Sequence, residues 1–186
     1  MKQNVNLIVA IGPNNVIGIK DKLLWNSKKD LQRFKELTKG KACIFGATTF
    51  YGLPNYPLKD RLNIVLDNTQ KEEITADNRG WVTCNSLECA LLFCANYKDV
   101  FICGGKSIYE YALKYNFINN VYLTTVDFKD LHDFIDTLIQ LGNKDLVYFP
   151  LDIKDYLRTW EKLETKQEQD ENGLNVSINR DTYVAS

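Results

Sequence analysis

Short apolar runs alternate along this chain with stretches in which apolar residues recur every three or four positions. Each run has the length and the β-branched content of a buried strand. The runs are VNLIVAI (5–11), KACIFG (41–46), LNIVL (62–66), WVTC (81–84), DVFIC (99–103) and VYLTTVD (121–127). The stretches between them have the spacing of amphipathic helices. This alternation predicts an α/β fold with a mostly parallel sheet that is covered by helices on both faces.

Residue types at the helix starts support these assignments. Ser27 can cap a helix in which Leu31 and Phe34 are spaced to face the sheet, and Ser86 can cap SLECALLFCA. A further helix, KSIYEYALKY (106–115), follows a pair of glycines. The last third differs, because RTWEKLETKQEQ and LNVSINRDTYV alternate polar and apolar residues around Glu171-Asn172-Gly173. That pattern predicts an antiparallel hairpin at the end of the sheet.

Residues 130–142 carry a helical pattern where a turn between two strands would suffice. Its apolar positions are Leu131, Phe134, Ile135, Leu138 and Leu141. Asp130 could cap this helix and Gly142 could end it. We therefore predict a real helix here, which either covers the edge of the sheet or serves a neighbouring loop.

Composition restricts the class of protein. A chain of 186 residues with 45% hydrophobic and 25% charged residues is the usual size of one domain, so we expect a single domain over residues 1–186. A formal net charge of -1 and a pI near 5.9 argue against nucleic acid and anionic membranes as partners and favour a small-molecule substrate. No apolar run has the length of a membrane span. We expect a cytoplasmic monomer.

Cysteine and histidine usage narrows the chemistry. The five cysteines lie in apolar runs without a C-x-x-C pair, which is typical of buried, reduced thiols. His132 is the single histidine, so a zinc site built on imidazole pairs is excluded, as is a histidine-based triad unless His132 serves alone. We expect no metal site.

Asp30 is the first candidate for chemistry. With Ser27 as the cap, Asp30 is the third helical residue, where the helix dipole favours a carboxylate and a capping box can form. That purely structural role is one reading. The other follows from Phe34 one turn later, which places the carboxylate beside apolar side chains, where desolvation raises a pKa and equips an acid for proton transfer.

Three further segments could form a site with Asp30. In ICGGKSIYEYAL (102–113) a strand runs through two glycines into a helix, so backbone N–H groups could hold a pyrophosphate, although such a pair is often only a tight turn. The turn-rich residues 14–26 are longer than a connection requires and could act as a lid. Arg61, just before a buried strand, could grip a carboxylate bidentately, although a solvated arginine is the default.

Taken in order, these motifs resemble dihydrofolate reductase. They are IVAI-x5-IG (8–18), LW-x4-D-L-x2-F-K (24–35), IFGATTF (44–50), PLKDRLNIVL (57–66), ICGG-x2-IYEYAL (102–113) and VYLTTVD (121–127), and the likeness resumes at Tyr148-Phe149-Pro150. The resemblance implies a single α/β domain whose central, mostly parallel sheet has eight strands, is flanked by helices and ends in an antiparallel hairpin. It also implies an oxidoreductase that reduces 7,8-dihydrofolate to tetrahydrofolate with NADPH, for one-carbon metabolism and thymidylate synthesis.

The resemblance also implies roles for individual residues. Asp30 would hydrogen-bond the pterin and promote protonation of its nitrogen 5 while hydride moves to carbon 6, Thr124 would hydrogen-bond the carboxylate, and Trp25 would help to hold an ordered water. Arg61 would grip the α-carboxylate of the glutamate tail. The other implied substrate contacts are Ile8, Leu31, Phe34, Leu53 and Cys103. The implied cofactor contacts are Ala10, Ile17, Gly18, Gly46, Thr48, Thr49, Gly104, Gly105, Lys106, Ser107, Ile108 and Tyr109. The peptide bond between the two glycines would be cis.

The chain departs from the family pattern in three places. Leu24 stands where the family commonly has proline, so the lid is expected to be less rigid. At the adenosine end, where the family places basic residues or serine, the chain has Ala47, Thr48, Asp67 and Asn68. An acid beside the ribose favours a free 2′-hydroxyl, so we expect weakened discrimination for NADPH, with NADH as a possible cofactor, unless Lys71 or Lys106 supplies the missing charge. The third departure is the helix at 130–142, where the family usually has an irregular loop against the lid.

Two alternatives remain at this point. A related reductase of the same fold that acts on a pyrimidine or another pterin would lack an acid at the position of Asp30 and the arginine before the buried strand. A folate-binding protein without catalysis would share the binding residues, so only turnover separates it from the enzyme.

Overall fold

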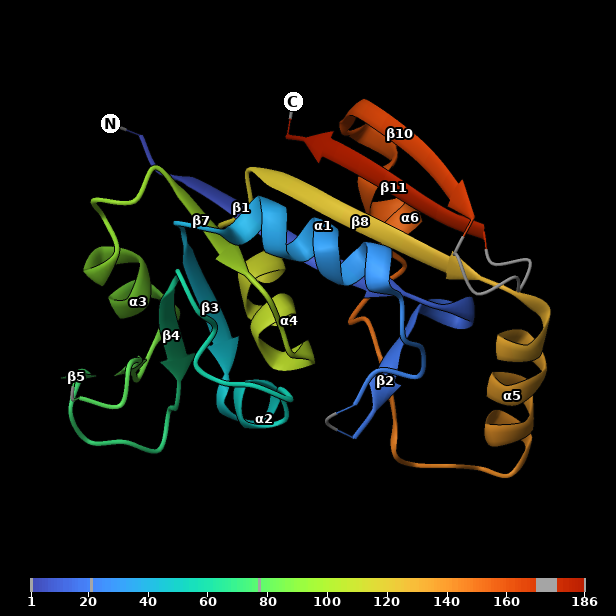
Figure 1. Cartoon of the computed structure of the whole chain (residues 1–186), viewed down its shortest axis with the longest axis horizontal. Coiled ribbons are helices and arrows are strands. Elements are labelled where there is room, and N and C mark those ends of the chain that lie inside the picture. Colours follow the sequence, from blue (N-terminus) through green and yellow to red (C-terminus); the bar gives the residue numbers. More distant parts are fainter. Residues whose placement is uncertain (1, 21, 77, 170–176, 186) are drawn as a thin grey trace.

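The computed structural model describes residues 2–20, 22–76, 78–169 and 177–185. One sheet of nine strands forms the centre of the molecule (Figure 1). Its order is β10 (Glu161–Gln169), β11 (Ser177–Val184), β8 (Asn120–Asp127), β1 (Asn4–Ile11), β7 (Asp99–Ile102), β3 (Ala42–Gly46), β4 (Leu62–Leu66), β6 (Val82–Cys84) and β5 (Ile74–Ala76). The strands from β8 to β6 run parallel, whereas β5, β11 and β10 pair antiparallel with their neighbours.

Helices cover both faces of this sheet, as the alternating pattern predicted. They are α1 (Lys28–Thr38), α2 (Ala47–Tyr51), α3 (Leu87–Phe93), α4 (Lys106–Lys114), α5 (Lys129–Gln140) and α6 (Ile153–Tyr156), with 3-10 turns η1 (Pro13–Asn15) and η2 (Leu157–Thr159). β3 separates two cores, because Ala42 and Ile44 pack with α3, α4 and α6 while Cys43 and Phe45 pack with α2 and the half-buried Phe34 of α1. Figure 1 shows α1 crossing in front of the sheet.

The strand count of the sequence-based prediction was wrong by one. The ninth strand, β5, has only three residues and mostly exposed side chains, so it has no apolar pattern to detect. A second sheet of two strands, β2 (Val16–Ile19) and β9 (Leu146–Tyr148), was also missed. The antiparallel pairing of β10 with β11 confirms the predicted hairpin, and its predicted turn at 171–173 lies outside the described residues.

The predicted helix at 130–142 is present as α5, but two of its details differ. Phe128 is the N-cap, so Asp130 lies in the first turn and does not cap the helix. Gly142 follows the helix in a left-handed conformation (φ 65°), as expected for a glycine that ends it. Leu131 and Ile135 are buried, whereas Phe134 and Leu141 are exposed, so only part of the apolar stripe faces the protein.

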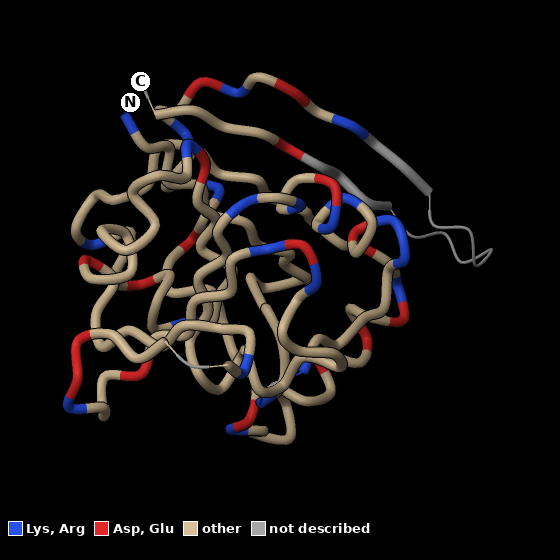
Figure 2. The backbone as a smooth tube through the Cα atoms, turned by 60° about the vertical axis from the view of Figure 1, so that its left-hand side comes forward, with Lys and Arg blue, Asp and Glu red and all other residues tan. Residues whose placement is uncertain are grey.

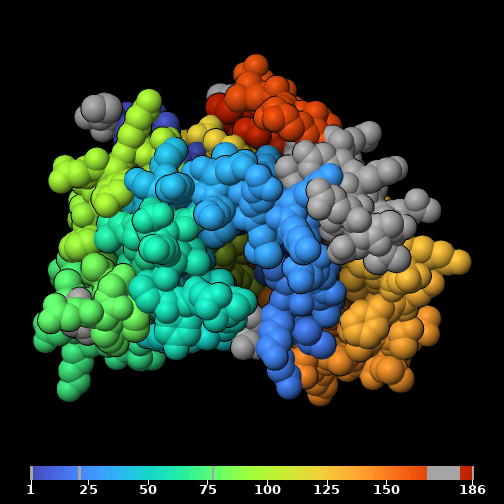
Figure 3. Space-filling view, in the orientation of Figure 1, coloured from blue at the N-terminus to red at the C-terminus, as the bar shows by residue number. Residues whose placement is uncertain are grey.

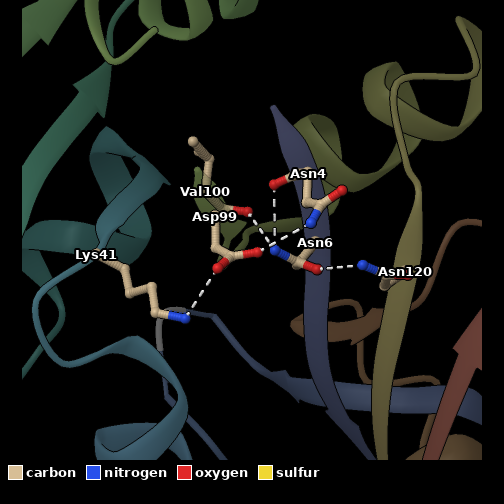
Figure 4. A network of polar contacts seen from close by, with 6 residues as sticks. All are labelled: Asn4, Asn6, Lys41, Asp99, Val100 and Asn120. Carbon is tan, nitrogen blue, oxygen red and sulfur yellow. Dashed lines mark hydrogen bonds and ion pairs between the residues drawn. The ribbon is translucent and has the colours of Figure 1, made fainter. Parts of the chain in front are cut away.

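A polar network joins the amino ends of four neighbouring strands (Figure 4). The buried Asn6 amide donates to the carbonyls of Asn4 and Val100 and accepts from Asn120 at 2.7 Å. Next to it, Asp99 accepts from Asn4 and pairs with Lys41, each at 3.2 Å. Burial raises the pKa of Asp99, but the hydrogen bonds from Asn4 and Lys41 outweigh that effect and hold the pKa below its ordinary value. The network aligns the strands at the edge opposite their carboxyl ends.

Two surface properties follow from the described residues. Acidic and basic residues are interspersed along the chain (Figure 2), in keeping with a net charge near zero. Among the described residues, no helix combines the length and the apolar composition that a membrane crossing requires.

Candidate active site

The carboxyl ends of β8, β1, β7 and β3 meet beside a hollow that is visible between α1, α2 and the β2 segment (Figure 3). In open parallel sheets, ligands bind at this end of the strands. Most of the residues predicted for the site belong to these strand ends or to the helices that follow them.

α1 places Asp30 at this hollow. The helix begins after Ser27, whose buried hydroxyl accepts a hydrogen bond from the Asp30 N–H at 3.1 Å, so the predicted cap is confirmed. One turn later, Arg33 Nη1 donates to Thr124 Oγ1 of β8 at 3.2 Å, which ties the first half of α1 to the sheet. The hydrogen bond predicted between Thr124 and the Asp30 carboxylate stays a prediction.

The side chains beside Asp30 are apolar, but they are less buried than the helical pattern suggested. Leu31 is 54% exposed, so the prediction that it faces the sheet was wrong. Phe34 and Leu53 are half-buried and pack against the cluster of Phe45 and Phe50. Apolar surface thus remains open on α1 next to the carboxylate, where a flat ring could pack.

α4 and β1 form the opposite wall. The Tyr109 hydroxyl of α4 donates to the Ile8 carbonyl of β1 at 2.8 Å. Burial raises the pKa of Tyr109 well above its ordinary value, and the neighbouring Cys103 thiol and Asp30 carboxylate raise it further. The Asp30 carboxylate makes the smallest of these three contributions to the pKa of Tyr109. The structure brings together Asp30, Ile8, Cys103 and Tyr109 from four separate segments.

Two glycine turns meet at the centre of the strand ends. The Gly46 N–H donates to the Gly104 carbonyl at 2.7 Å, and the peptide bond between Gly104 and Gly105 is cis, as the resemblance implied. A Cβ on Gly105 would lie 2.7 Å from Thr49 Oγ1, and one on Gly46 would lie 3.3 Å from Ile108 Cδ1. A side chain at Gly105 would therefore force Thr49 to move, whereas one at Gly46 would press on the end of the Ile108 side chain, so glycine favours the close approach of the β3–α2 and β7–α4 turns.

This pair of turns fits a pyrophosphate. Gly46 and Gly105 are the N-cap residues of α2 and α4, and neither has a side chain that could cap the first N–H groups. Such N–H groups, together with the positive end of a helix, favour a phosphate. Around them Thr48, Lys106 and Ser107 are exposed and Ile108 is buried. The predicted cofactor wall is thus assembled in one place.

The predicted lid has more regular structure than the sequence suggested. Residues 16–19 form β2, which pairs with β9, and a Cβ on Gly18 would overlap the Lys22 carbonyl oxygen. Ile17 packs against the core that contains α3, α4 and α6, called the main core from here on, and Ala10 packs against the cluster that contains Trp25. Trp25 is buried, and its Nε1 has no hydrogen-bond partner among the described residues. A buried N–H of this kind is usually satisfied by an ordered water or a ligand.

Arg61 is held in place by α1. Its Nε donates to Thr38 Oγ1 at 3.0 Å, and its two terminal nitrogens donate to the carbonyls of Lys59 at 2.6 Å and Lys35 at 3.2 Å. These bonds orient the guanidinium, and Nη1 and Nη2 each carry a second N–H that could donate to a carboxylate. The arrangement suits the predicted role of Arg61 and excludes a freely solvated side chain.

The predicted adenosine end is at β4, two strands away in the sheet from β7, which the glycine pair follows. Asp67 follows β4, and its carboxylate accepts from the Thr69 hydroxyl at 2.6 Å and from the Thr69 N–H at 2.9 Å. These two bonds hold the pKa of Asp67 below its ordinary value, so the side chain is charged at neutral pH. Ala47 is the first residue of α2, which follows β3, the strand next to β4. The predicted adenosine end therefore carries a carboxylate and a methyl group.

One feature near the lid was not found from the sequence. A cavity of about 270 Å³ lies beside η1 and is lined in part by Asn14, Asp127, His132 and Lys154. His132 Nε2 contacts Asp127 Oδ1 at 2.7 Å there. The sequence signal was the position of His132 in the first turn of a helix that starts just after a strand, but nothing in the sequence linked it to η1.

Comparisons with known proteins identify the family. The family model described as dihydrofolate reductase matches residues 4–183. A dihydrofolate reductase of Buchnera aphidicola is 38% identical over 129 residues, which are 69% of this chain and 76% of that protein. One from Drosophila melanogaster is 35% identical over 133 residues, which are 65% of this chain and 72% of that protein.

Two further similarities cover nearly the whole chain. A bifunctional dihydrofolate reductase-thymidylate synthase of Paramecium tetraurelia is 27% identical over 97% of this chain, which spans 36% of that longer protein. A solved structure of Enterococcus faecalis dihydrofolate reductase, complexed with NADP(H) and RAB-propyl, superposes with a TM-score of 0.76 and 24% identity, covering 97% of this chain and 95% of that one. The structural likeness confirms the fold, and with the family model it leads to one conclusion: the chain belongs to the dihydrofolate reductase family.

Proposed function

We propose that this chain reduces 7,8-dihydrofolate to 5,6,7,8-tetrahydrofolate with hydride from NADPH, and that Asp30 is the acid that governs protonation of the substrate. Membership of the family makes the chain an NADPH-dependent oxidoreductase, as the sequence predicted. The roles of individual residues are our own assignment. They rest on the geometry of the site and on the resemblance of its motifs to those of the family.

The position of Asp30 carries the assignment. Ser27 fixes this carboxylate in the first turn of α1, Arg33 and Thr124 anchor the helix to β8, and the Asp30 charge reaches Tyr109 on the opposite wall. The exposed apolar side chain of Leu31 follows the acid directly on α1. A flat, donor-rich heterocycle matches this surface, because the ring can pack on apolar atoms while its N–H groups donate to the carboxylate.

The chemistry of the chain is proton control and orientation. Bound NADPH supplies the hydride. The Asp30 carboxylate accepts hydrogen bonds from the pterin amino group and a ring nitrogen, and its negative charge favours a protonated nitrogen 5, which makes carbon 6 a better hydride acceptor. Trp25 Nε1, which has no hydrogen-bond partner in the described part of the chain, is suited to hold a water near the same ring. Arg61, oriented by Thr38 and Lys35, grips the carboxylate at the far end of the substrate.

The cofactor is held by backbone more than by charge. The uncapped N–H groups after Gly46 and Gly105 would bind the pyrophosphate, with Thr49 between the two turns. Ala10, Ile17 and Gly18 lie on the β1 and β2 side, where the nicotinamide ring would face the pterin. The lid over that ring would exclude water from the reacting atoms.

The decisive experiment compares Asp30→Asn with Glu36→Gln, which neutralises an exposed acid two turns later on the same helix. We expect Asp30→Asn to bind dihydrofolate but to lose roughly a hundredfold or more of the hydride-transfer rate at neutral pH. The loss should shrink as the pH falls, because the solvent then protonates nitrogen 5. Glu36→Gln should behave like the unmutated chain.

The readouts are absorbance of NADPH during single turnover, over a range of pH, and direct binding of dihydrofolate. Full turnover by Asp30→Asn at neutral pH would remove Asp30 from the reaction. An unmutated chain that binds folate but shows no NADPH oxidation would favour the folate-binding protein without catalysis. An unmutated chain that neither binds nor reduces dihydrofolate would point to a related reductase with another substrate.

A further inference from the structure

α5 lies in the connection between β8 and β9, and the carboxyl end of this connection is hydrogen-bonded to the lid segment, which the structure describes as residues 14–20 and 22–26. After α5, β9 pairs with β2 of the lid, the Lys20 N–H donates to the Asp145 carbonyl at 2.8 Å, and the Phe149 N–H donates to the Asn15 carbonyl at 2.8 Å. Before α5, β8 carries Thr124 beside α1. The helix therefore bridges the floor of the candidate active site and the backbone of the lid.

The contact between α5 and the lid is an apolar core of its own. Its buried members, which we call the lid cluster, are Val16, Trp25, Val126, Leu131, Ile135 and Leu146. Val16 and Trp25 belong to the lid, whereas the other members belong to β8, α5 and β9. Ala10, predicted to face the nicotinamide, packs against the edge of this cluster. The lid thus has a core that is separate from the main cores of the sheet.

Gly12 shows how tightly these parts meet. A Cβ built on Gly12 would lie 3.0 Å from Trp25 Cζ3, 3.4 Å from Leu131 Cδ2 and 3.6 Å from Ile135 Cδ1. The edge of the Trp25 indole and the methyl groups of the two α5 residues therefore converge on one point above the Gly12 backbone. Leu131 is 2% exposed and Ile135 is 0% exposed, so both side chains are buried among their neighbours.

The polar contacts that α5 makes with its surroundings are weaker than its buried apolar contacts. Asn14 Nδ2 and Asp136 Oδ1 are 3.5 Å apart at an exposed position, and the side chains of His132 and Asp127 are about half exposed. Exposed pairs of this kind contribute little, because water and salt screen them. The buried apolar contacts are therefore what holds the lid to α5.

We propose that Leu131 and Ile135 are positioning residues for the reduction of dihydrofolate, acting through Trp25 and Gly12. By wedging the indole against the Gly12 backbone, they keep the lid and Trp25 at the distance from Asp30 and Ala10 that the reaction requires. The proposal rests on the proposed function, since it assigns these residues to that site. Side chains far from the reacting atoms can matter in this way, because small displacements of a reacting pair are costly in rate.

The test uses Ile135→Ala and a matched variant, Ile118→Ala. Ile118 is also a buried isoleucine, but it lies in the main core just before β8, at the amino ends of the strands. The same number of carbon atoms is removed from each, so loss of stability alone would affect both. Phe134→Ala, on the exposed side of α5, controls for a change in the helix itself. Ile135→Val is the conservative variant that should restore function.

Two measurements separate positioning from stability. The first is single-turnover hydride transfer, which we expect to fall roughly tenfold or more in Ile135→Ala and to stay within about twofold in Ile118→Ala, Phe134→Ala and Ile135→Val. The second is quenching of Trp25 fluorescence by a soluble quencher, in a background with Trp81→Phe and Trp160→Phe. Quenching should increase in Ile135→Ala and remain unchanged in the other three variants.

Equal turnover and equal quenching in Ile135→Ala and Ile118→Ala would overturn the proposal. The failure of the proposed function has a different signature. If the unmutated chain does not oxidise NADPH with dihydrofolate, that function is wrong, while the Trp25 quenching still decides whether α5 holds the indole. If quenching rises in Ile135→Ala but its turnover matches Ile118→Ala, α5 packs on Trp25 without positioning it for the reaction, and the proposal fails.

Discussion

The chemistry proposed for this molecule depends on single side chains, one in the first turn of a helix and one just after a strand. Asp30 and Asp67 are both carboxylates near the cleft, but their surroundings differ. Asp30 stands next to the open apolar side chain of Leu31 and within reach of Tyr109, whereas Asp67 is hydrogen-bonded by Thr69 at the rim. The first arrangement suits an acid that faces a ring, and the second keeps a negative charge at neutral pH where the nucleotide is predicted to end.

Asp67 should weaken the preference of the enzyme for NADPH over NADH. A charged carboxylate beside the ribose repels a 2′-phosphate and accepts a hydrogen bond from a 2′-hydroxyl. We expect the ratio of kcat/KM for NADPH to that for NADH to be below about a thousandfold, or about 4 kcal/mol. In Asp67→Asn the ratio should rise, since the repulsion is gone.

The measurement is kcat/KM for both dinucleotides, together with dissociation constants for each from fluorescence titration. Asp155→Asn, an exposed acid on α6, is the control for a general change in charge. A ratio above a thousandfold in the unmutated chain would mean that another group binds the 2′-phosphate. Lys71 and Lys106 are the first residues to replace in that case.

Helix caps and strand ends are the elements in which local sequence and structure agree best. Ser27 and Ser86 both accept the expected hydrogen bond from the N–H three residues later, and α1 and α3 begin where these residues predicted. The longer-range elements behave differently. β2 and β9 pair although more than a hundred residues separate them in the sequence. Because each depends on this distant partner, neither could be predicted as a strand from its own segment.

Ser86→Ala should lower the free energy of unfolding by about 1 kcal/mol, because the Cys89 N–H loses its partner at the start of α3. Turnover should not change, since α3 packs on the main core away from the strand ends. Ser86→Asp, which can cap as well as serine does, is the matched control. Urea unfolding curves of the three proteins measure the difference, and equal stability of Ser86→Ala and the unmutated chain would show that this cap is not required.

The polar network at the amino ends of the strands predicts a dependence of stability on pH. The pKa of Asp99 is held below its ordinary value, so its ionised form contributes stability that is present above the pKa of the unfolded chain and is lost as the pH falls through the lower pKa of the folded chain. The free energy of unfolding should therefore decrease below about pH 4. In Asp99→Asn this decrease should be smaller, with a loss at neutral pH of about 1 kcal/mol.

Unfolding curves over a range of pH test this prediction. The control is Asp145→Asn, which removes an exposed carboxylate that pairs with Lys20. That variant should follow the unmutated chain, because exposed pairs contribute little. If Asp99→Asn has the same pH profile as the unmutated chain, the bonds from Asn4 and Lys41 do not stabilise the folded state in the way proposed.

At the scale of the whole molecule, the cleft is assembled from segments that span most of the chain. α1, the glycine turns, β8 and the lid all contribute, so a ligand that binds them together must favour the folded state. Saturating NADPH should therefore raise the free energy of unfolding, by about 2.7 kcal/mol at a concentration a hundredfold above its dissociation constant.

Thermal unfolding with increasing NADPH measures this gain, and adenosine alone, which lacks the pyrophosphate, serves as the comparison. Gly105→Ala should abolish most of the gain, because its Cβ would lie 2.7 Å from Thr49 Oγ1 and displace the turn that holds the pyrophosphate. A full gain in Gly105→Ala would place the pyrophosphate elsewhere.

The sequence by itself determined the elements that depend on local order. The apolar runs gave six of the strands, the serines gave two helix starts, and the spacing around Asp30, Arg61 and Gly104-Gly105 identified the family before any contact was known. These features could be predicted because strand pattern, capping and turn chemistry act over a few neighbouring residues.

Only the tertiary structure decided which side chains meet. It showed that Leu31 stays exposed, that Gly105 lies against Thr49, that Arg61 is oriented by α1, and that the buried half of the α5 stripe packs on Trp25 of the lid. An apolar stripe predicts that one face of a helix is buried. Which element packs against that face, and how much of the stripe is covered, depends on segments far away in sequence. Packing between those segments is a property of the whole fold, so it becomes known only once the strands and helices are in place.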